Sequence, residues 1–257
     1  MVPTENNLRL LSGNSHERQC KMVKLLKYPE DEQIIKKICS MNDYTKALNP
    51  NCTSKDVIEA CEVVKKYGFA SVCVYPTWTK LAAEHLKGSK SAVLIPIGYP
   101  HGSTSIEAKV AEAKQALIDG ATEIDMVINI ARFFDEDYEY VRRDIESVVK
   151  ICAEHHVFVK AIIETGYLSD VQKRKIVEIA IAAGVTFIKT CSGFGPGKAT
   201  MHDVALLVDA VNGRCEVKAT GDVASLEDQL AFIELGATRV AGRGHILDQL
   251  RRIGMDL

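Results

Sequence analysis

Three lysines and one aspartate interrupt apolar runs of this sequence at places where a charged side chain is unexpected. Lys160 stands in "VFVKAIIETG", Lys189 in "TFIKTCSGFGPGKAT" and Lys218 in "EVKATGD", whereas Asp125 stands in "EIDMVIN". Lysine is a poor strand former, and its charge is costly to bury. A single lysine of this kind is more often a surface residue with a buried stem, or an ion-pair partner. Three of them with one carboxylate also fit a lysine-based reactive site, and both interpretations stay open on the residues alone.

The chemistry that such a cluster permits depends on a lysine that loses its proton near neutral pH. Burial and a second nearby cation both lower the pKa of an amine. Lys189 and Lys218 end successive apolar runs, so one can act on the other. A neutral amine attacks a carbonyl to form a Schiff base, and Asp125 could transfer protons during C–C cleavage. Asp125 could equally form a structural salt bridge with any of the three lysines, and for Glu164 we favour an ordinary ion pair with Lys160.

The elements that must position these residues follow a repeated pattern, in which a helical period ends at glycine and a short apolar run follows. Gly68, Gly120, Gly184 and Gly236 each occupy this place, where glycine supplies a left-handed helix cap. The alternation predicts parallel strands joined by helices. The expected strands are 41–45, 69–75, 91–97, 123–129, 157–163, 186–190, 215–219 and 238–242. The expected helices are 54–67, 77–87, 104–119, 137–155, 169–183, 201–212, 225–235 and 245–253.

Eight such units predict an α/β fold of the (β/α)8 TIM barrel type, with a short N-terminal helical extension. We expect residues 1–38 to form the extension, in which "PEDEQIIKKICSM" predicts a helix, and residues 39–257 to form the barrel. An open doubly wound sheet is the alternative, but no GxGxxG motif follows any expected strand. A barrel carries its function at the carboxyl ends of its strands, where the three lysines and Asp125 would then meet.

Glycine-rich segments follow the last three expected strands. They read "SGFGPGKAT", "ATGDVAS" and "AGRGH". Backbone N–H groups in such turns, with a helix N-terminus behind them, can bind phosphate. Taken singly, each segment also fits an ordinary turn, so an anion site is predicted only from the three together.

The bulk composition excludes several classes of function. The formal charge of −2, with lysine and arginine spread along the chain, disfavours a nucleic-acid-binding protein. No apolar stretch reaches the length of a membrane span, and no apolar segment of signal-peptide type is present near the N-terminus. We therefore expect a cytoplasmic protein without membrane contact, whose eight cysteines are reduced. The seven histidines form no HxH or HExxH motif, so no metal site is expected.

The segment "FIKTCSGFGPGKAT" resembles the signature of the deoxyribose-phosphate aldolase family, class I aldolases with a (β/α)8 barrel. "EACEVVKKYGFASVCVYPTWTKLAAEHL", "IPIGYPHGSTSIEAKVAEAKQALIDGATEIDMVINI", "VFVKAIIETGYL" and "EVKATGDV" are similar to the same family in the same order, over about residues 41–245. The resemblance implies reversible cleavage of 2-deoxy-D-ribose 5-phosphate to glyceraldehyde 3-phosphate and acetaldehyde, with no metal or organic cofactor. A homo-oligomer is also expected.

The resemblance also implies roles for individual residues. Lys189 matches the Schiff-base lysine, Lys218 the second lysine that perturbs it, and Asp125 the acidic proton relay. Cys73 matches a pocket-lining cysteine, and Lys160 a lysine that borders the site. The expected substrate-binding residues are Cys73, Lys160, Thr190, Gly193, Gly221, Gly242 and Arg243.

Two positions depart from the family pattern and bear on the substrate. Asp222 replaces the second of two glycines after Lys218, and its carboxylate would repel a bound phosphate. Arg243 stands in a turn that commonly contains serine, where it could bind phosphate or pair with Asp222. The chain also lacks the C-terminal tyrosine that some members use. An aldolase for a non-phosphorylated or differently charged sugar, and a catalytically idle sugar-phosphate-binding barrel, therefore stay as alternatives.

Overall fold

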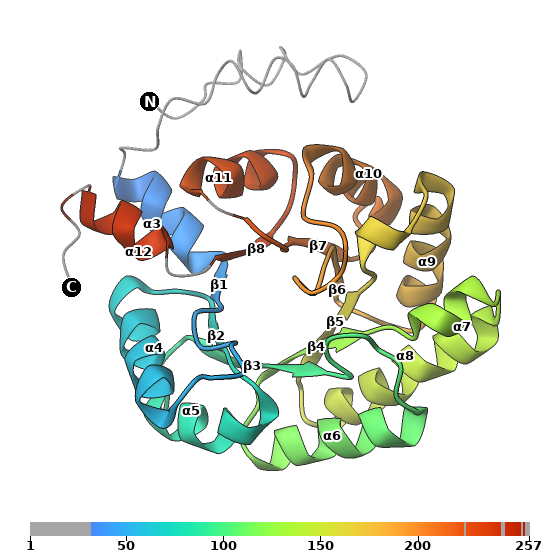
Figure 1. Cartoon of the computed structure of the whole chain (residues 1–257), viewed down its shortest axis with the longest axis horizontal. Helices are drawn as coiled ribbons and strands as arrows, with labels where there is room; N and C mark the ends of the chain where they lie inside the picture. Colours follow the sequence, from blue (N-terminus) through green and yellow to red (C-terminus); the bar gives the residue numbers. More distant parts are fainter. Residues whose placement is uncertain (1–31, 224, 243–244, 253, 255–257) are drawn as a thin grey trace.

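The structure, a computed structural model, describes residues 32–223, 225–242, 245–252 and 254. Eight parallel strands form a closed barrel in sequence order, surrounded by helices (Figure 1). The strands are β1 (Asn42–Tyr44), β2 (Ser71–Cys73), β3 (Ala92–Ile97), β4 (Glu123–Val127), β5 (Phe158–Ile162), β6 (Phe187–Lys189), β7 (Glu216–Ala219) and β8 (Arg239–Gly242). The predicted TIM barrel is confirmed, and each strand lies within its predicted range.

The outer layer contains a helix after every strand. These helices are α4 (Ser54–Tyr67), α5 (Thr79–His85), α6 (Ile106–Ile118), α8 (Tyr138–Glu154), α9 (Asp170–Ala182), α10 (Met201–Val211), α11 (Leu226–Glu234) and α12 (His245–Arg252). Short turns of helix are η2 (Pro76–Trp78), at the start of the predicted range 77–87, and α7 (Ile130–Phe134) and η3 (Thr165–Tyr167), which the sequence pattern did not predict. The five residues of α7 are too few to show a helical period, although the Asn129 side chain accepts a hydrogen bond from the Arg132 N–H and so caps it.

Local sequence explains where several helices begin and end. Thr53 and Asp56 form a reciprocal capping box at the start of α4, and Ser169 and Gln172 do the same for α9. Gly68 adopts φ = 67° after α4, a left-handed conformation that glycine reaches without steric cost. These signals fix the short connections that carry the chain from each helix into the next strand.

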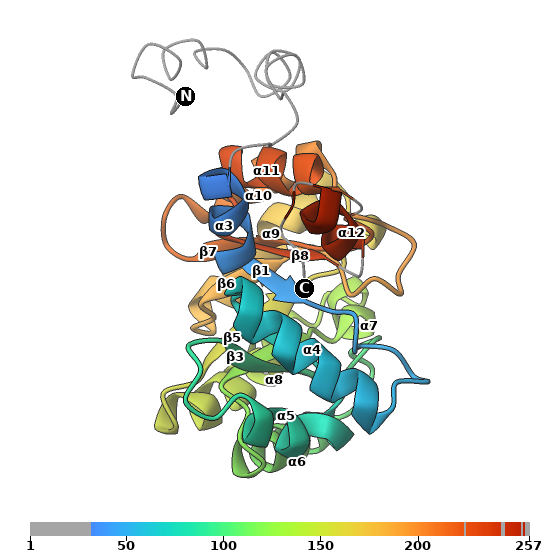
Figure 2. The same ribbon diagram turned by 90° about the vertical axis from the view of Figure 1, so that its left-hand side faces the viewer.

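The segment before the barrel contains a helix, as predicted. It is α3 (Glu32–Ser40), which buries Ile35, Ile38 and Cys39 and contacts α11. The view from the side shows α3 beside α11 (Figure 2). None of the described helices is both long and apolar enough to cross a membrane.

The strand register decides which side chains meet inside the barrel. Ile124, Met126, Ile188 and Val217 belong to the main apolar core. The alternate positions carry the charged residues, because successive side chains of a strand point to opposite faces. Lys189 is level with Lys218 on the neighbouring strand, and Asp125 is level with Lys160. The barrel interior is therefore charged at its centre, unlike the aliphatic filling that is usual for this fold.

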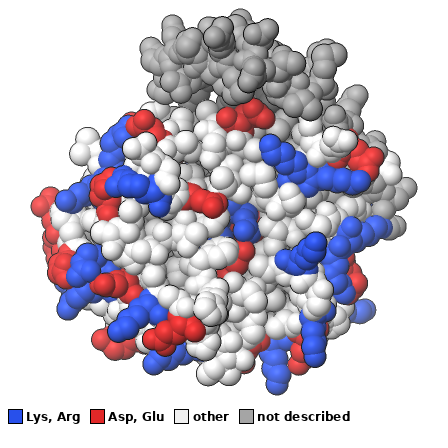
Figure 3. Space-filling view, turned by 180° about the vertical axis from the view of Figure 1, so that it is seen from behind, with Lys and Arg blue, Asp and Glu red and all other residues white. Residues whose placement is uncertain are grey.

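The outer surface shows no dominant sign of charge on the face opposite to that of Figure 1. Basic and acidic side chains are interspersed over the described residues that are visible there (Figure 3). This distribution agrees with the formal charge of −2 and offers no broad basic surface on that face.

Candidate active site

Lys189, Lys218 and Asp125 meet inside the barrel. The Lys189 Nζ lies 2.7 Å from Asp125 Oδ2, and the Lys218 Nζ lies 2.6 Å from the same oxygen. All three side chains are buried, and Asp125 is fully so. The two amines therefore share one carboxylate oxygen, and neither projects into bulk solvent.

The surroundings of the two lysines drive their pKa values apart. Burial lowers the pKa of Lys189; Asp125 opposes this, while the Lys218 ammonium acts in the same direction as burial. Burial also disfavours the charge on Lys218, but the carboxylates of Asp125 and Asp43 outweigh it and raise the pKa of Lys218. Lys189 is thus the amine that loses its proton first, and Lys218 stays an ammonium beside it.

Asp125 stays ionised although it is buried. Burial alone would raise its pKa, but the ammonium groups of Lys189, Lys218 and Lys160 hold the pKa of Asp125 well below its ordinary value. Its second oxygen, Oδ1, lies 3.2 Å from the Lys160 Nζ. A carboxylate in contact with a neutral amine can accept and return protons in a Schiff-base reaction.

Asp43 is a site residue that the sequence analysis missed. It is fully buried on β1, and its Oδ2 lies 2.5 Å from the Lys218 Nζ. Its Oδ1 accepts hydrogen bonds from the Ser71 hydroxyl, at 2.6 Å, and from Arg239. The signal was available, because Asp43 in "MNDYT" is an acidic residue within a predicted strand, like Asp125.

The expected ion pair between Lys160 and Glu164 is wrong. Lys160 instead donates to Glu123 Oε2 at 2.5 Å and contacts Asp125 across the neighbouring strand. Residues four apart along a strand are separated by about 13 Å, whereas residues level on adjacent strands are about 5 Å apart. The strand pairing therefore determines the partner of Lys160.

Glu164 instead organises the loop that follows Lys189. Its Oε2 accepts the backbone N–H of Ser192 at 3.0 Å, and the side chain is almost completely buried. A Cβ atom added to Gly195 would lie 2.6 Å from the Glu164 Cδ, so the loop fits closely against this carboxyl group. Glu164 itself adopts φ = 54°, an uncommon conformation for a residue other than glycine. These contacts fix the loop immediately after Lys189.

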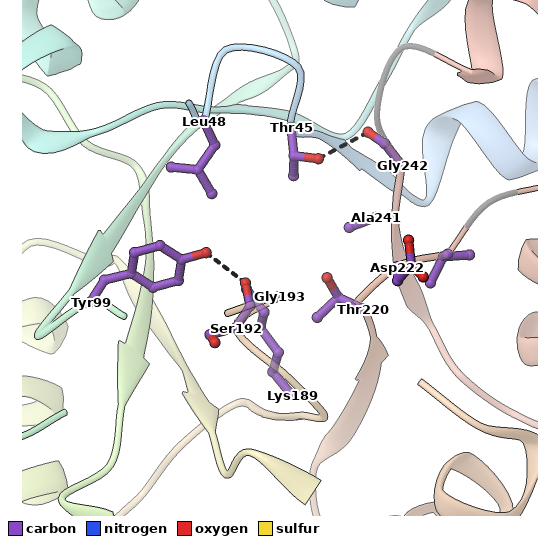
Figure 4. A pocket seen from close by; sticks show the side chains of 12 residues that line it. Thr45, Leu48, Tyr99, Lys189, Ser192, Gly193, Thr220, Asp222, Ala241 and Gly242 are labelled. Atoms are coloured by element: carbon purple, nitrogen blue, oxygen red, sulfur yellow. Dashed lines mark hydrogen bonds between the residues drawn. The ribbon is translucent and has the colours of Figure 1, made fainter. Parts of the chain in front are cut away.

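A cavity of about 720 Å³, including its open mouth, lies at the carboxyl ends of the strands. Lys189 forms part of its wall, and Tyr99 and Asp222 lie on opposite sides (Figure 4). The Tyr99 hydroxyl donates to the Ser192 carbonyl at 2.5 Å and so links the loops after β3 and β6. The remaining lining residues are Thr45, Leu48, Ser192, Gly193, Thr220, Gly221, Val223, Ala241 and Gly242.

The structure separates the predicted substrate-binding residues into two groups. Gly193, Gly221 and Gly242 line the cavity. Cys73, Lys160 and Thr190 are buried and are not among its lining residues. Thr190 links β6 to β7, because its hydroxyl donates to the Thr220 carbonyl at 2.6 Å and accepts from the Thr220 N–H at 2.9 Å. Burial raises the pKa of the Cys73 thiol to about 12. Arg243 lies outside the described residues.

Gly221 has a steric reason to be glycine. Its φ is 106°, and an added Cβ would lie 2.7 Å from the Cys191 Cβ. Asp222, the next residue, is exposed and has φ = 50°. The turn after Lys218 therefore presents backbone at the cavity and carries one carboxylate at its edge.

One cluster of possible metal ligands lies elsewhere among the described residues. Asp170, His202 and Asp203 bring their donor atoms within 4.8 Å of one another. The Lys173 ammonium lies 3.2 Å from Asp170 and 2.6 Å from Asp203, so both carboxylates already form an ion pair with a lysine. The cluster thus forms a salt-bridge network between α9 and α10.

Comparison with known families agrees with this geometry. The model of the DeoC/LacD family of aldolases matches residues 37–245, which include every strand of the barrel and the lysines Lys160, Lys189 and Lys218. The chain belongs to the DeoC/LacD aldolase family. This aldolase is 43% identical over 227 residues to the deoxyribose-phosphate aldolase of Caldanaerobacter subterraneus subsp. tengcongensis, covering 87% of this chain and 98% of the relative. It is 48% identical over 195 residues to that of Thermococcus gammatolerans, covering 75% and 87%.

Solved structures share the same barrel. This aldolase superimposes on an aldolase named QR15 with a TM-score of 0.78 and 34% identity, covering 84% of this chain and 96% of the other. The tetrameric deoxyribose phosphate aldolase of Aeropyrum pernix gives a TM-score of 0.78 and 25% identity, covering 91% and 96%. The predicted family membership is confirmed, and this chain is a lyase of the aldolase type.

Proposed function

We propose that this aldolase cleaves 2-deoxy-D-ribose 5-phosphate reversibly to glyceraldehyde 3-phosphate and acetaldehyde through a Schiff base on Lys189. One observation carries the proposal: the Lys189 amine lines the cavity while it shares a single Asp125 oxygen with the charged Lys218. The names of the relatives supply the substrate. The roles of the residues follow from the chemistry that their positions permit.

In the proposed reaction, the neutral Lys189 amine attacks the C1 aldehyde of the open-chain sugar and forms a carbinolamine. Loss of water gives a protonated imine, which withdraws electrons from the adjacent carbon. A base removes the C3 hydroxyl proton, the C2–C3 bond breaks, and glyceraldehyde 3-phosphate leaves. The electron pair stays on C2 as an enamine, which is then protonated. Hydrolysis of the resulting imine releases acetaldehyde and restores the Lys189 amine.

Asp125 and Lys218 divide the supporting work in this proposal. Asp125 contacts both amines and relays protons during carbinolamine formation and enamine protonation, directly or through a water. Lys218 stays charged and disfavours a second positive charge on Lys189. Lys160 and Asp43 neutralise the remaining charges of the cluster.

For the phosphate, we propose the end of the cavity that the loops after β6, β7 and β8 form. Gly193, Gly221 and Gly242 contribute backbone there, and backbone N–H groups suit a phosphate. Asp222 lines the same cavity and would weaken phosphate binding by repulsion. The alternative substrate, a non-phosphorylated or differently charged sugar, rests on this carboxylate.

The decisive experiment is borohydride reduction in the presence of deoxyribose 5-phosphate, followed by peptide mass spectrometry. We expect a stable adduct on Lys189, and none at that position in Lys189→Leu. Lys109→Met, which removes another buried lysine that does not line the cavity, is the matched control and should still form the adduct. Absence of an adduct with any small aldehyde or sugar would refute the Schiff-base mechanism.

A second measurement distinguishes the alternative substrates. Turnover of deoxyribose is compared with that of its 5-phosphate, in the unaltered protein and in Asp222→Gly. We expect the phosphate to be preferred, and more strongly so in Asp222→Gly because the repulsion is removed. A preference for free deoxyribose would support the alternative sugar. No turnover of either, with intact binding of the phosphate, would support the idle barrel.

Three further expectations concern the setting of the reaction. We propose a homo-oligomer, since a solved relative is described as tetrameric, and light scattering measures this. We propose turnover without a metal or organic cofactor, because the amine supplies the electron sink; activity that a chelator removes would contradict this. A cytoplasmic location is likewise proposed, and fractionation tests it.

A further inference from the structure

Six charged side chains form a closed ring inside the barrel, in which cations and anions alternate. In order around the ring they are Arg239, Asp43, Lys218, Asp125, Lys160 and Glu123. The six contacts that close the ring are between 2.5 and 3.2 Å long. Five of the strands contribute: β1, β4, β5, β7 and β8. Each member therefore contacts one opposite charge on either side.

Glu123 and Arg239 close this ring on the side away from the cavity. The Arg239 Nη1 donates to Asp43 Oδ1 at 2.7 Å and to Glu123 Oε2 at 3.2 Å, and its Nη2 donates to Glu123 Oε1 at 3.1 Å. Both residues begin their strands, whereas the cavity lies at the strand ends. Neither lines the cavity nor forms an ion pair with Lys189. They are also largely buried, with 6% and 14% of their side chains exposed.

Lys189 lies outside this ring. It contacts the ring only at Asp125 Oδ2, the oxygen that Lys218 already contacts. The ring contains three cations and three anions, so its formal charge is zero without Lys189. A proton on Lys189 would therefore add a buried charge for which the ring holds no further counter-charge. An uncompensated buried charge is costly, whereas a neutral amine is not.

We propose that Glu123 and Arg239 are positioning residues that keep this ring neutral and so leave the Lys189 amine free of its proton. The inference rests on the proposed role of Lys189. It assigns a function to two side chains that touch no reacting atom. On this proposal, the charges of Glu123 and Arg239, together with that of Lys218, determine how reactive the Lys189 amine is. Changing the charge of either residue should then change the ionisation of Lys189 in a direction that the charge count gives.

The groups that act on Lys189 come from several strands. Asp125 on β4, Lys218 on β7 and Cys73 on β2 act on Lys189 directly. The further charged groups around the cluster, on the described residues, are Asp43 on β1, Glu123 on β4, Lys160 on β5, Arg239 on β8, Glu164 after β5 and Asp222 at the cavity. The Cys73 thiol, whose pKa is raised to about 12, stays uncharged at neutral pH. Glu164 is buried as well, but its carboxyl group accepts the Ser192 N–H. The other buried charged groups of the cluster are the six ring members, and the ring supplies the carboxylate that contacts Lys189.

The test measures the ionisation of Lys189 without any sugar substrate. Trace acetylation by acetic anhydride modifies only neutral amines, and peptide mass spectrometry gives the rate at Lys189 as a function of pH. In Arg239→Met the ring carries one surplus negative charge, so the rise in rate should move up by about one pH unit. In Glu123→Gln the ring carries one surplus positive charge, so the rise should move down by about as much. The pH profile of kcat/KM for the aldol substrate should follow the same order.

The double variant Glu123→Gln/Arg239→Met restores the balance, with two cations and two anions, and should return the profile to that of the unaltered protein. Arg239→Lys keeps the charge and should leave the profile in place. Lys109→Met removes a buried cation elsewhere and is the matched control. Shifts of equal sign in both single variants, or none in Glu123→Gln, would overturn the proposal. The acetylation rate needs no sugar, so it can be measured even if the protein does not cleave deoxyribose 5-phosphate. If Arg239→Met does not fold, the near-isosteric variant Glu123→Gln tests the proposal alone.

Discussion

Two regions of the molecule bury lysine against carboxylate, and they differ in how the charges are shared. Between α6 and α8, the Lys109 Nζ lies 2.5 Å from Asp144 Oδ2 and donates to the Val127 carbonyl at 2.9 Å. Asp144 Oδ2 also accepts the Asn129 N–H at 3.2 Å. Both side chains are fully buried. This is one cation for one anion, with backbone groups as further partners.

In the barrel, by contrast, Asp125 contacts the amines of three lysines, and Lys218 contacts two carboxylates. Burial lowers the pKa of Lys109 against the opposing effect of Asp144, and burial lowers the pKa of Lys189 as well. A lowered pKa is thus common to both regions and does not by itself make a nucleophile. What distinguishes Lys189 is that it lines a cavity and shares with Lys218 the one carboxylate with which it forms an ion pair in the described part of the chain. Lys109 lies wholly within the packed protein.

The largest effect that the comparison predicts is loss of activity without loss of the fold. Lys189→Leu should lower kcat/KM for deoxyribose 5-phosphate by more than about 10⁴-fold, because the nucleophile is removed. Circular dichroism should show an unchanged barrel, because the charge ring is complete without Lys189. Steady-state kinetics measures the loss. Substantial turnover with a new imine on Lys218 would show that the two amines are interchangeable.

Substitution of the two buried aspartates should have different effects, on catalysis for Asp125 and on stability for Asp144. Asp125→Asn should lower kcat by about 10²- to 10⁴-fold, the range for loss of a proton-transfer group. The rise of activity with pH should also move to lower pH, since Asp125 raises the pKa of Lys189 and its removal favours the neutral amine. Asp144→Asn is the matched variant and should leave kcat unchanged. Equal losses of kcat in both variants would contradict the distinction between the regions.

Breaking the structural pair should chiefly destabilise the protein. Lys109→Met leaves Asp144 buried without its cation, which costs about 3–5 kcal/mol. Urea denaturation measures this, with kcat of the folded protein retained. The double variant Lys109→Met/Asp144→Leu should recover much of the loss, because an apolar pair leaves no unpaired charge. Full stability of the single variant would show that Lys109 contributes nothing to the fold.

The smallest effect concerns a contact at the cavity mouth that belongs to neither buried cluster. Tyr99→Phe removes the hydrogen bond to the Ser192 carbonyl and should cost about 0.5–1.5 kcal/mol of loop stabilisation. We expect this mainly as a rise in KM, by less than about tenfold, since Lys189 is untouched. Tyr75→Phe, whose ring neighbours Tyr99 at 6.2 Å, is the control and should change KM less. A pH profile altered as in the ring variants would contradict this assignment.

Much of the fold was predictable from local sequence. The glycine-ended helices and apolar runs predicted eight strand–helix units, because capping and side-chain periodicity are local properties. The predicted range 137–155 contains α8, whereas α7 escaped detection because five residues carry too little periodicity. The buried lysines and Asp125 were also visible as charges inside apolar runs. Asp43 carried the same signal but lay outside the quoted family motifs. Glu123 carried it within "EIDMVIN", beside Asp125, and was not singled out.

Residue type and spacing along the chain were enough to predict the order of the elements, and they marked Lys189, Lys218 and Asp125 as candidates for a reactive site. The ion-pair partners of these residues follow instead from the pairing of the strands in the folded barrel. Lys160 pairs with Glu123 and Asp125 rather than with Glu164, because the register of β4 against β5 sets level neighbours that chain distance does not reveal. The closed ring, and with it the place of Lys189 outside it, exists only once the barrel joins β8 to β1.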